Sequence, residues 1–126
     1  MIEGSAIIEI EKRLEAAVND LSKRVNAVAQ ARQVKEFNSE MRKNLLASFK
    51  VKHSEDNDSD AGQETLARAD IEYQQGLELL KSDYQKAEKH IAAWDVANAK
   101  FESCRSLLAM ARQQVPAAFR ESGRQP

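Results

Sequence analysis

The sequence predicts an all-α protein: an antiparallel hairpin of two long helices that forms a coiled coil, with two copies paired into a four-helix bundle. Apolar residues recur every seventh position in both halves of the chain, and one short acidic stretch separates the halves. This spacing is typical of helices that pack as coiled coils. The 126 residues include only 4 Gly and 2 Pro, which leaves little material for the tight turns of a sheet. At this length we expect one domain, residues 1–126.

The first long helix is expected over residues 6–52, which contain neither proline nor glycine. Its early apolar side chains, spaced by seven, are Ile7, Leu14, Leu21 and Val28. A side chain repeated at this interval stays on one face of a helix, where a partner helix can cover it.

The apolar series of this helix changes phase after Val28. Its later members are Val34, Phe37, Met41, Leu45 and Phe49. A shift of this kind alters the local winding of a coiled coil. We therefore predict altered winding near residues 29–33, without a break in the helix.

Residues 53–60 are polar and acidic, and we expect them to connect the two helices as a solvated loop, with Ser59 or Asp60 as the helix cap. The acidic side chains alternate like calcium ligands at Asp56, Asp58 and Asp60. Gly62 comes one place too late for that motif, and Ala67 replaces its bidentate carboxylate. These three aspartates are therefore weak metal candidates, and no metal site is predicted.

The second long helix is expected over residues 61–115. Its heptad series is Leu66, Tyr73, Leu80, Ala87, Trp94, Phe101, Leu108 and Val115. About 50 helical residues would span roughly 75 Å, a length that needs a partner helix to bury its apolar stripe. After it, residues 116–126 are expected to form a short segment that packs Phe119 back.

The packed face of the second helix is predicted to rotate near Trp94. Before that residue the companion positions are Leu77, Tyr84 and Ile91, and after it they are Ala97, Cys104 and Ala111. Asn98 then points to the boundary of the packed face. Small residues on the shifted face let another helix approach closely.

Basic residues dominate 32–52 and acidic residues dominate 64–78. An antiparallel hairpin places these two segments side by side. Exposed ion pairs contribute only about 0–1 kcal/mol each, so the charges favour an orientation more than they stabilise it.

Apolar residues off the main stripes predict self-association, because a two-helix hairpin covers only one face of each helix. They are Ile8, Leu46, Val51, Ile71, Leu79, Val96, Leu107 and Met110. We expect a homodimer whose interface contains Trp94, Phe101, Leu107, Leu108, Leu79, Leu80, Tyr84 and Ile91.

No catalytic constellation is found, and we expect neither an enzyme nor a cofactor. His53 lies in the loop and His90 in the middle of a helix, so they are not expected to share a site. Glu88 and His90 lack the spacing of a di-iron motif. Cys104 falls on the packed face, where we expect it to pack as a small apolar residue, and the sequence places no base beside it.

The net charge of −1 makes a general nucleic-acid binder unlikely, because such proteins carry a basic excess. A single cysteine fits a reducing compartment, and the apolar run Ala6–Ile8 is too short for a signal or a membrane span. We expect a cytoplasmic protein.

The leading functional prediction is a non-enzymatic structural or interaction protein of adaptor, chaperone or stalk type, which self-associates and presents a helical surface to a protein partner. In gross architecture alone it resembles small secretion-system stalk and chaperone proteins and phage or plasmid accessory proteins. One alternative is a small-molecule- or metal-binding bundle that uses the Trp94 and His90 region or the acidic loop. A weaker alternative is a nucleic-acid-associated regulator that uses residues 32–52.

Overall fold

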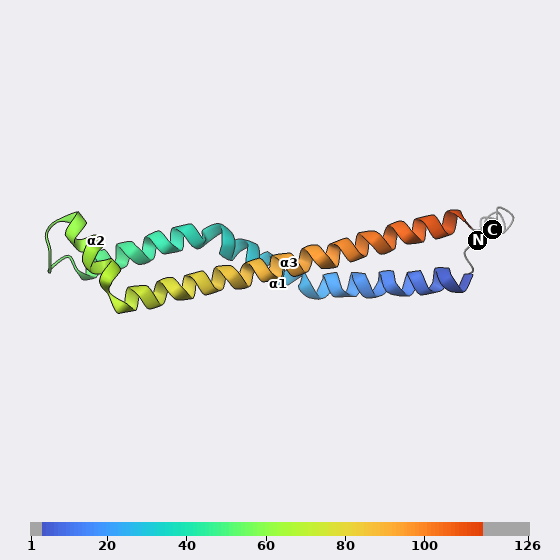
Figure 1. Cartoon of the computed structure of the whole chain (residues 1–126), viewed down its shortest axis with the longest axis horizontal. Coiled ribbons are helices and arrows are strands. Elements are labelled where there is room, and N and C mark those ends of the chain that lie inside the picture. The colour runs from blue at the N-terminus through green and yellow to red at the C-terminus, as the bar shows by residue number, and fades with distance from the viewer. Residues whose placement is uncertain (1–3, 115–126) are drawn as a thin grey trace. The chain divides into compact units, whose positions relative to one another are not determined.

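The computed structural model describes residues 4–114, and these residues form helices and connecting turns without a strand (Figure 1). In chain order they are α1 (Gly4–Lys52), α2 (Asp60–Ala69) and α3 (Ile71–Gln113), and α1 packs on α3. The all-α class is confirmed, and so is an unbroken first helix. The predicted end of the second helix at Val115 and the segment 116–126 lie outside the described residues.

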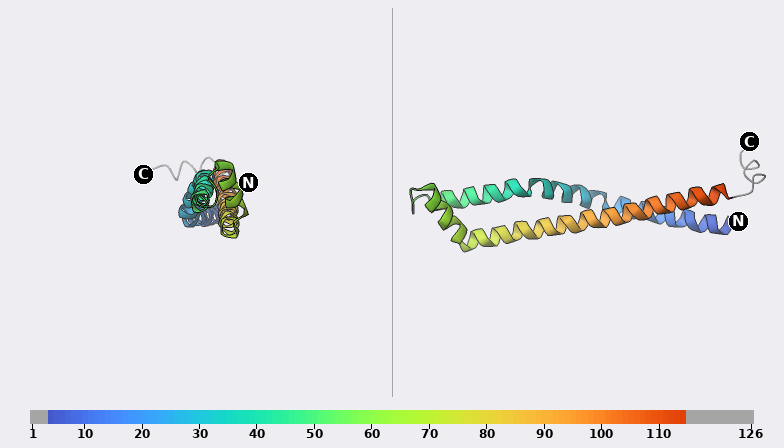
Figure 2. Two further views of the ribbon diagram at one scale, coloured as in Figure 1. Left: turned by 90° about the vertical axis from the view of Figure 1, so that its left-hand side faces the viewer. Right: turned by 45° about the horizontal axis from the view of Figure 1, so that its top comes forward.

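The chain divides into two compact units, which are described separately. The loop unit, Asn26–Ile91, holds the second half of α1, the whole of α2 and the first half of α3. The terminal unit is made of residues 1–25 and 92–126. In each unit a segment of α1 lies beside a segment of α3 in the views of Figures 1 and 2.

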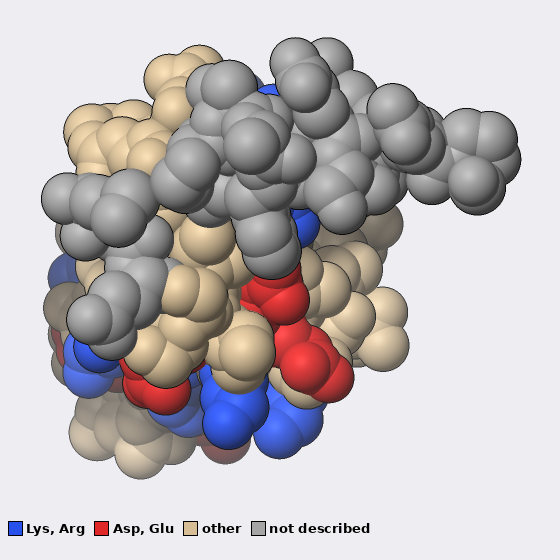
Figure 3. Space-filling view, turned by 90° about the vertical axis from the view of Figure 1, so that its right-hand side faces the viewer, with Lys and Arg blue, Asp and Glu red and all other residues tan. Residues whose placement is uncertain are grey.

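In the terminal unit, the beginning of α1 lies beside the end of α3. The Nη2 atom of Arg112 is 3.5 Å from the Oε1 atom of Glu11, which indicates antiparallel packing. Ala97, Leu108 and Ala111 are buried here, whereas Asn98 is exposed. The predicted rotation of the packed face after Trp94 is thereby confirmed. Figure 3 shows acidic and basic side chains interspersed on one face, as a net charge of −1 leads one to expect.

In the loop unit, aromatic and aliphatic side chains fix the register of α1 against α3. The rings of Phe49 and Tyr73 meet edge to face, with their centroids 5.7 Å apart. Leu45 lies so close to Gly76 that an added Cβ would be 3.1 Å from its Cδ2 atom. The absence of a side chain at Gly76 therefore lets the helices approach closely at this level.

The loop and the start of α2 are held by short polar side chains. The Oγ atom of Ser59 accepts a hydrogen bond from the Gly62 N–H at 3.0 Å, so Ser59 is the cap. The side-chain oxygen of Asn57 accepts hydrogen bonds from the Ser59 N–H at 2.9 Å and from its hydroxyl at 3.0 Å. The Gln63 side chain donates a hydrogen bond to the Asn57 carbonyl at 2.9 Å.

The prediction of one uninterrupted helix over 61–115 is wrong at Asp70. This residue has φ −69° and ψ 127°, an extended conformation that ends α2 and precedes α3. Its Oδ1 atom accepts a hydrogen bond from the Glu72 N–H at 2.9 Å and so caps α3. Its Oδ2 atom is 2.8 Å from the Nζ atom of Lys52, which belongs to α1. The break depends on this contact between distant parts of the chain, which a helical pattern in the sequence does not reveal.

Candidate interaction surface

The face of α1 that packs on α3 in the loop unit contains polar as well as apolar residues. Val28, Ala31 and Asn38 are buried. Val28 belongs to the early heptad series, and Ala31 and Asn38 each lie three residues after a position of that series, so the packed face continues without a shift. Asn38 is only 5 % exposed, and its Nδ2 atom donates a hydrogen bond to the Leu80 carbonyl at 3.1 Å. The prediction that the packed face changes phase after Val28 is therefore wrong.

Two cations follow the same face. The Nε atom of Arg42 is buried and has no hydrogen-bond partner among the described residues. The Nζ atom of Lys35 lies 5.6 Å from the centre of the Tyr84 ring, within the range of a cation–π contact. This part of the α1–α3 contact is thus partly polar, which costs stability compared with an apolar core.

Of the five apolar residues predicted for this core, Leu45 and Phe49 pack on α3, but the other three are exposed. Val34, Phe37 and Met41 are 36 %, 52 % and 51 % exposed. Their spacing of three and four residues places them on one face of the helix. We define the Phe37 face as the uncharged residues on this side of α1, which are Gln30, Gln33, Val34, Phe37, Met41, Asn44 and Ser48, and Glu40 borders it three residues after Phe37.

A groove of about 200 Å³ runs along the edge of the Phe37 face. Its α1 side is formed by Ala27, Gln30, Ala31 and Val34. Its α3 side is formed by Asp83, Lys86, Ala87 and His90. The Phe37 face therefore has an α3 border that carries charge of both signs, while Glu40 lies at its other edge and pairs with Lys43 at 3.4 Å.

The first part of α3 exposes a second apolar patch. Ile71 and Leu79 are both about two-thirds exposed, at 68 % and 67 %. A wide, shallow depression of about 630 Å³ extends from one to the other, with Gln75 and Ser82 between and beside them. Such a depression offers area to a protein surface and little enclosure to a small molecule.

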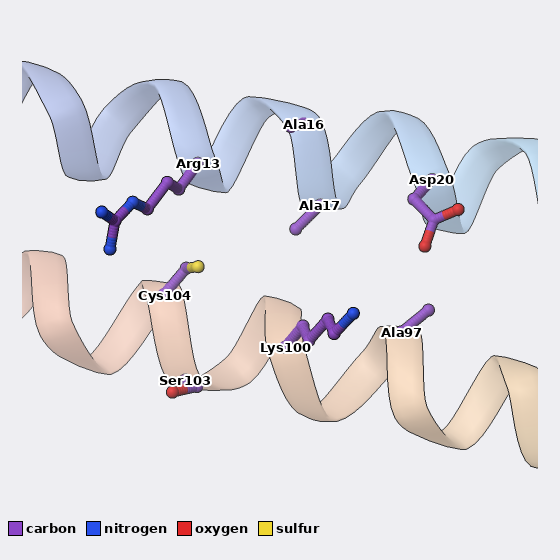
Figure 4. A pocket seen from close by; sticks show the side chains of 8 residues that line it. All are labelled: Arg13, Ala16, Ala17, Asp20, Ala97, Lys100, Ser103 and Cys104. Carbon is purple, nitrogen blue, oxygen red and sulfur yellow. The ribbon is translucent and has the colours of Figure 1, made fainter.

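The terminal unit contains a groove of about 400 Å³ between α1 and α3 (Figure 4). Its walls are formed by Arg13, Ala16, Ala17, Asp20, Ala97, Lys100, Ser103 and Cys104. In Figure 4 the side chains of Arg13 and Cys104 approach each other from opposite helices. Small and charged residues make up this lining, and no histidine is among them to activate the thiol.

The predicted interface residues are divided between the two units. Leu79, Leu80, Tyr84 and Ile91 belong to the loop unit, and Trp94, Phe101, Leu107 and Leu108 belong to the terminal unit. Leu108 is buried, most of the others are half-buried, and only Leu79 and Leu107 are exposed. The role of this set in an interface between copies stays a prediction.

The acidic loop residues face basic side chains of the same chain. Asp56 lies against His53 at 3.1 Å, and Asp60 pairs with Lys50. Within residues 4–114 no group of three His, Cys, Asp or Glu side chains is arranged to hold a metal ion. The geometry of Asp56 and Asp60 therefore favours ion pairs within the chain over shared coordination of a cation.

Sequence reasoning missed the Phe37 face because it assigned Val34, Phe37 and Met41 to the core. The available signal was that Asn38 and Arg42 continue the early heptad spacing of α1. Over this short stretch, two faces of the helix each show a seven-residue repeat. Choosing the more apolar of the two as the buried face gives the wrong result.

None of the described helices combines the length and apolar character needed to cross a bilayer. Comparison of the chain with protein-family models, curated proteins and solved structures finds no match.

Proposed function

We propose that the protein is a non-enzymatic interaction protein that self-associates through the Phe37 face and presents a further helical surface to a protein partner. The observation that carries this proposal is the exposure of Val34, Phe37 and Met41 beside a packed position that holds Asn38. A helix that exposes its larger apolar residues and buries a polar one is organised to meet another surface on its apolar side. Of the residues three or four positions from Phe37, only Glu40 is charged, and this low charge agrees with the depletion of charged residues at interface cores.

The occupant we propose for the Phe37 face is a second copy of the chain. Met41 lies four residues from Phe37 in one direction, and Val34 lies three residues away in the other, on the same side of the helix. A two-fold axis at the level of Phe37 therefore brings Val34 of each copy close to the level of Met41 in the other. The apolar part of the face is self-complementary, as an isologous contact requires.

The exposed area sets the strength of this contact. Val34 is 36 % exposed and Phe37 and Met41 are about half exposed, so two copies together would cover only a small apolar area, as in weak and transient interfaces. We therefore expect a weak dimer, with a dissociation constant in the range of about 10 μM to 1 mM. Its four packed helices correspond to the predicted four-helix bundle.

Sedimentation equilibrium tests the proposed dimer. The wild-type chain is expected to change from monomer to dimer between about 10 μM and 1 mM. The Phe37→Glu variant places a charge at the centre of the face and is expected to stay monomeric throughout. Ile8→Glu is the matched control, because Ile8 is 54 % exposed and lies on the same helix in the other unit.

The control variant is expected to dimerise like the wild type, and circular dichroism should show equal helix content in all three proteins. A wild-type chain that remains monomeric at about 1 mM contradicts the proposal. Equal dimerisation of the Phe37→Glu and Ile8→Glu variants contradicts the assignment of the contact to the Phe37 face.

The surface we propose for a different protein partner is the depression between Ile71 and Leu79. These residues leave more of their side chains exposed than those of the Phe37 face do. A partner that offers an apolar helix edge would cover them, as an adaptor, chaperone or stalk protein requires. The Leu79→Asp variant is expected to abolish capture of such a partner while leaving the sedimentation behaviour unchanged. If the Leu79→Asp variant no longer dimerises, the same surface serves both self-association and binding of the partner.

A further inference from the structure

The end of α1, the loop and the α2–α3 junction are joined by one group of charged side chains, which we call the His53 cluster: Lys52, His53, Asp56 and Asp70. The Nδ1 atom of His53 lies 3.1 Å from the Oδ2 atom of Asp56, and its Nε2 atom lies 2.9 Å from the Oδ2 atom of Asp70. The imidazole and the Asp70 side chain are only 18 % and 11 % exposed. The cluster is thus a contact between three segments within the loop unit.

Asp70 connects this cluster to the helix break. Its carboxylate accepts hydrogen bonds from the Glu72 N–H, the Lys52 ammonium and the His53 ring. Its own N–H donates to the Ala67 carbonyl at 3.1 Å, and its carbonyl accepts the Gln74 N–H at 3.1 Å. The geometry of both α2 and α3 at the junction therefore depends on how this one carboxylate is held.

The imidazole of His53 can satisfy both carboxylates only when it is protonated. A neutral imidazole has one N–H donor and one acceptor nitrogen, whereas the imidazolium has two donors. Because Asp56 and Asp70 lie at opposite ring nitrogens, a neutral ring would direct a lone pair at one of them. Because Asp56 and Asp70 lie at opposite ring nitrogens, they also cannot bind one metal ion together with either nitrogen.

The charged groups that affect protonation of the His53 ring come from each segment that contacts it. The loop supplies Asp56, the α2–α3 junction supplies Asp70, and α1 supplies Lys52, which lies 3.5 Å from Glu72 of α3 as well. The hydrogen bond to Asp70, followed by that to Asp56, raises the pKa of His53 above its ordinary value. Lys52, followed by His53, holds the pKa of the Asp70 carboxyl well below its usual range.

We propose that the His53 cluster is a proton-operated latch that holds the loop and α2 against the end of α1. In the closed latch the imidazolium bridges Asp56 and Asp70. When the ring loses its proton, it keeps one N–H bond, to the less exposed Asp70, and releases Asp56 with the loop. The freed loop also carries Asn57 and Ser59, so the start of α2 loosens with it.

The sign of the pH dependence follows from the direction of the two pKa changes. The raised pKa of His53 gives a stabilisation that is complete below about pH 6.5 and is lost as the pH rises through the pKa of the folded protein. The lowered pKa of Asp70 gives a stabilisation that is complete above about pH 4 and is lost only in stronger acid. In the folded protein the latch is therefore closed below the raised pKa of His53, down to the strong acid in which Asp70 gains a proton, and it opens as the pH rises through the pKa of His53.

Amide hydrogen exchange on the full chain, followed by NMR and corrected for the intrinsic rate at each pH, tests the latch. The informative amides are those of Asp56, Gly62 and Gln63, whose acceptors lie in the loop. Their protection is expected to fall at least about threefold as His53 loses its proton, while amides in the middle of α3 keep theirs. The ring signals of His53, titrated in the same sample, should give a midpoint above about 6.5 that coincides with this fall.

Two variants separate the latch from a general effect of pH. In His53→Gln the loop amides should keep the same low protection at every pH, because no proton operates the contact. His90→Gln removes the other histidine, which lies in the middle of α3, and should behave like the wild type. Loop protection that does not change across the His53 titration overturns the proposal. A pH dependence that survives in His53→Gln overturns it as well, and circular dichroism of that variant checks that it is folded.

Discussion

At the scale of single residues, Asn38 explains best why the packed face of α1 is where it is. Its side chain reaches the Leu80 carbonyl across the helix contact, and its burial leaves Phe37 and Met41 outside. A polar residue at a packed position of a coiled coil selects one register at a cost in stability. We interpret Asn38 as this kind of selector, since Arg42, four residues later on the same face, is half-buried without an apolar gain.

Replacing Asn38 with leucine should therefore stabilise the protein. We expect the free energy of unfolding to rise by roughly 1 kcal/mol, because a polar group that makes one neutral hydrogen bond is replaced by an apolar one. Urea denaturation measures the change. Asn98→Leu, at an exposed position of α3, is the control and should stay within about 0.5 kcal/mol of the wild type. A loss of more than about 1 kcal/mol in Asn38→Leu would mean that its hydrogen bond outweighs the cost of burial.

At the scale of elements, the start of α2 and the break before α3 are both set by short polar side chains. Ser59 caps α2, with Asn57 holding Ser59 in place, and Asp70 caps α3. The ten residues of α2 are too few to form a stable helix alone, so these caps and its contacts maintain it. The loop is thus an ordered connection built from polar contacts.

Gly62 gives a direct test of this arrangement. An added Cβ at Gly62 would collide with the side chain of Asn57. Alanine gains up to about 1 kcal/mol of helix propensity, but displacing Asn57 breaks two hydrogen bonds that contribute about 0.5–1.5 kcal/mol each. Gly62→Ala should therefore lower the free energy of unfolding by roughly 0–2 kcal/mol, with greater exchange at the Ser59 amide.

The matched control for this substitution is Gly4→Ala. Nothing lies within 4 Å of a Cβ built at Gly4, so alanine there should be neutral or slightly stabilising. If both alanine variants are stabilising, Asn57 moves away without cost, and its hydrogen bonds to Ser59 contribute little.

At the scale of the whole molecule, the exposed apolar residues are spread over both units. Phe37 and Leu79 are exposed in the loop unit, and Val96 and Met110 in the terminal unit. The boundary between the units in α3 falls at Ile91 and Ala92, next to the position where the packed face rotates. Scattered exposed residues are ordinary on a protein surface, and the low charge around Phe37 on its own helix face distinguishes that face from the others.

Self-association makes stability depend on protein concentration. Binding of one folded copy to another stabilises the folded state by mass action, so the melting temperature should rise with concentration. Between about 10 μM and 1 mM we expect a rise of roughly 3–8 °C in the wild type, followed by circular dichroism in cells of different path length. Phe37→Glu should show no such rise. A rise of equal size in that variant would locate the association elsewhere on the chain.

Much of the fold follows from the spacing of residues in the sequence. The all-α class, the unbroken α1 and the rotation of the packed face after Trp94 were all predictable, because each depends on the local periodicity of apolar residues along a helix. Ser59 was one of the two predicted caps for the same reason, since a capping side chain bonds to backbone only a few residues away. These features are properties of short segments.

What the sequence left undecided is which of two competing faces is buried, and where a helix breaks. Val34, Phe37 and Met41 compete with Ala31 and Asn38 for contact with α3, and the contacts of Asn38 with Leu80 and of Phe49 with Tyr73 together decide between them. Likewise Asp70 is an acceptable helix residue until Lys52 and His53, far away in the sequence, hold its carboxylate at the junction. The sequence by itself determined that this chain forms long helices, because helix formation depends on neighbours three and four residues apart. Only the tertiary structure decided the exposed Phe37 face and the His53 cluster, because both result from contacts between distant segments.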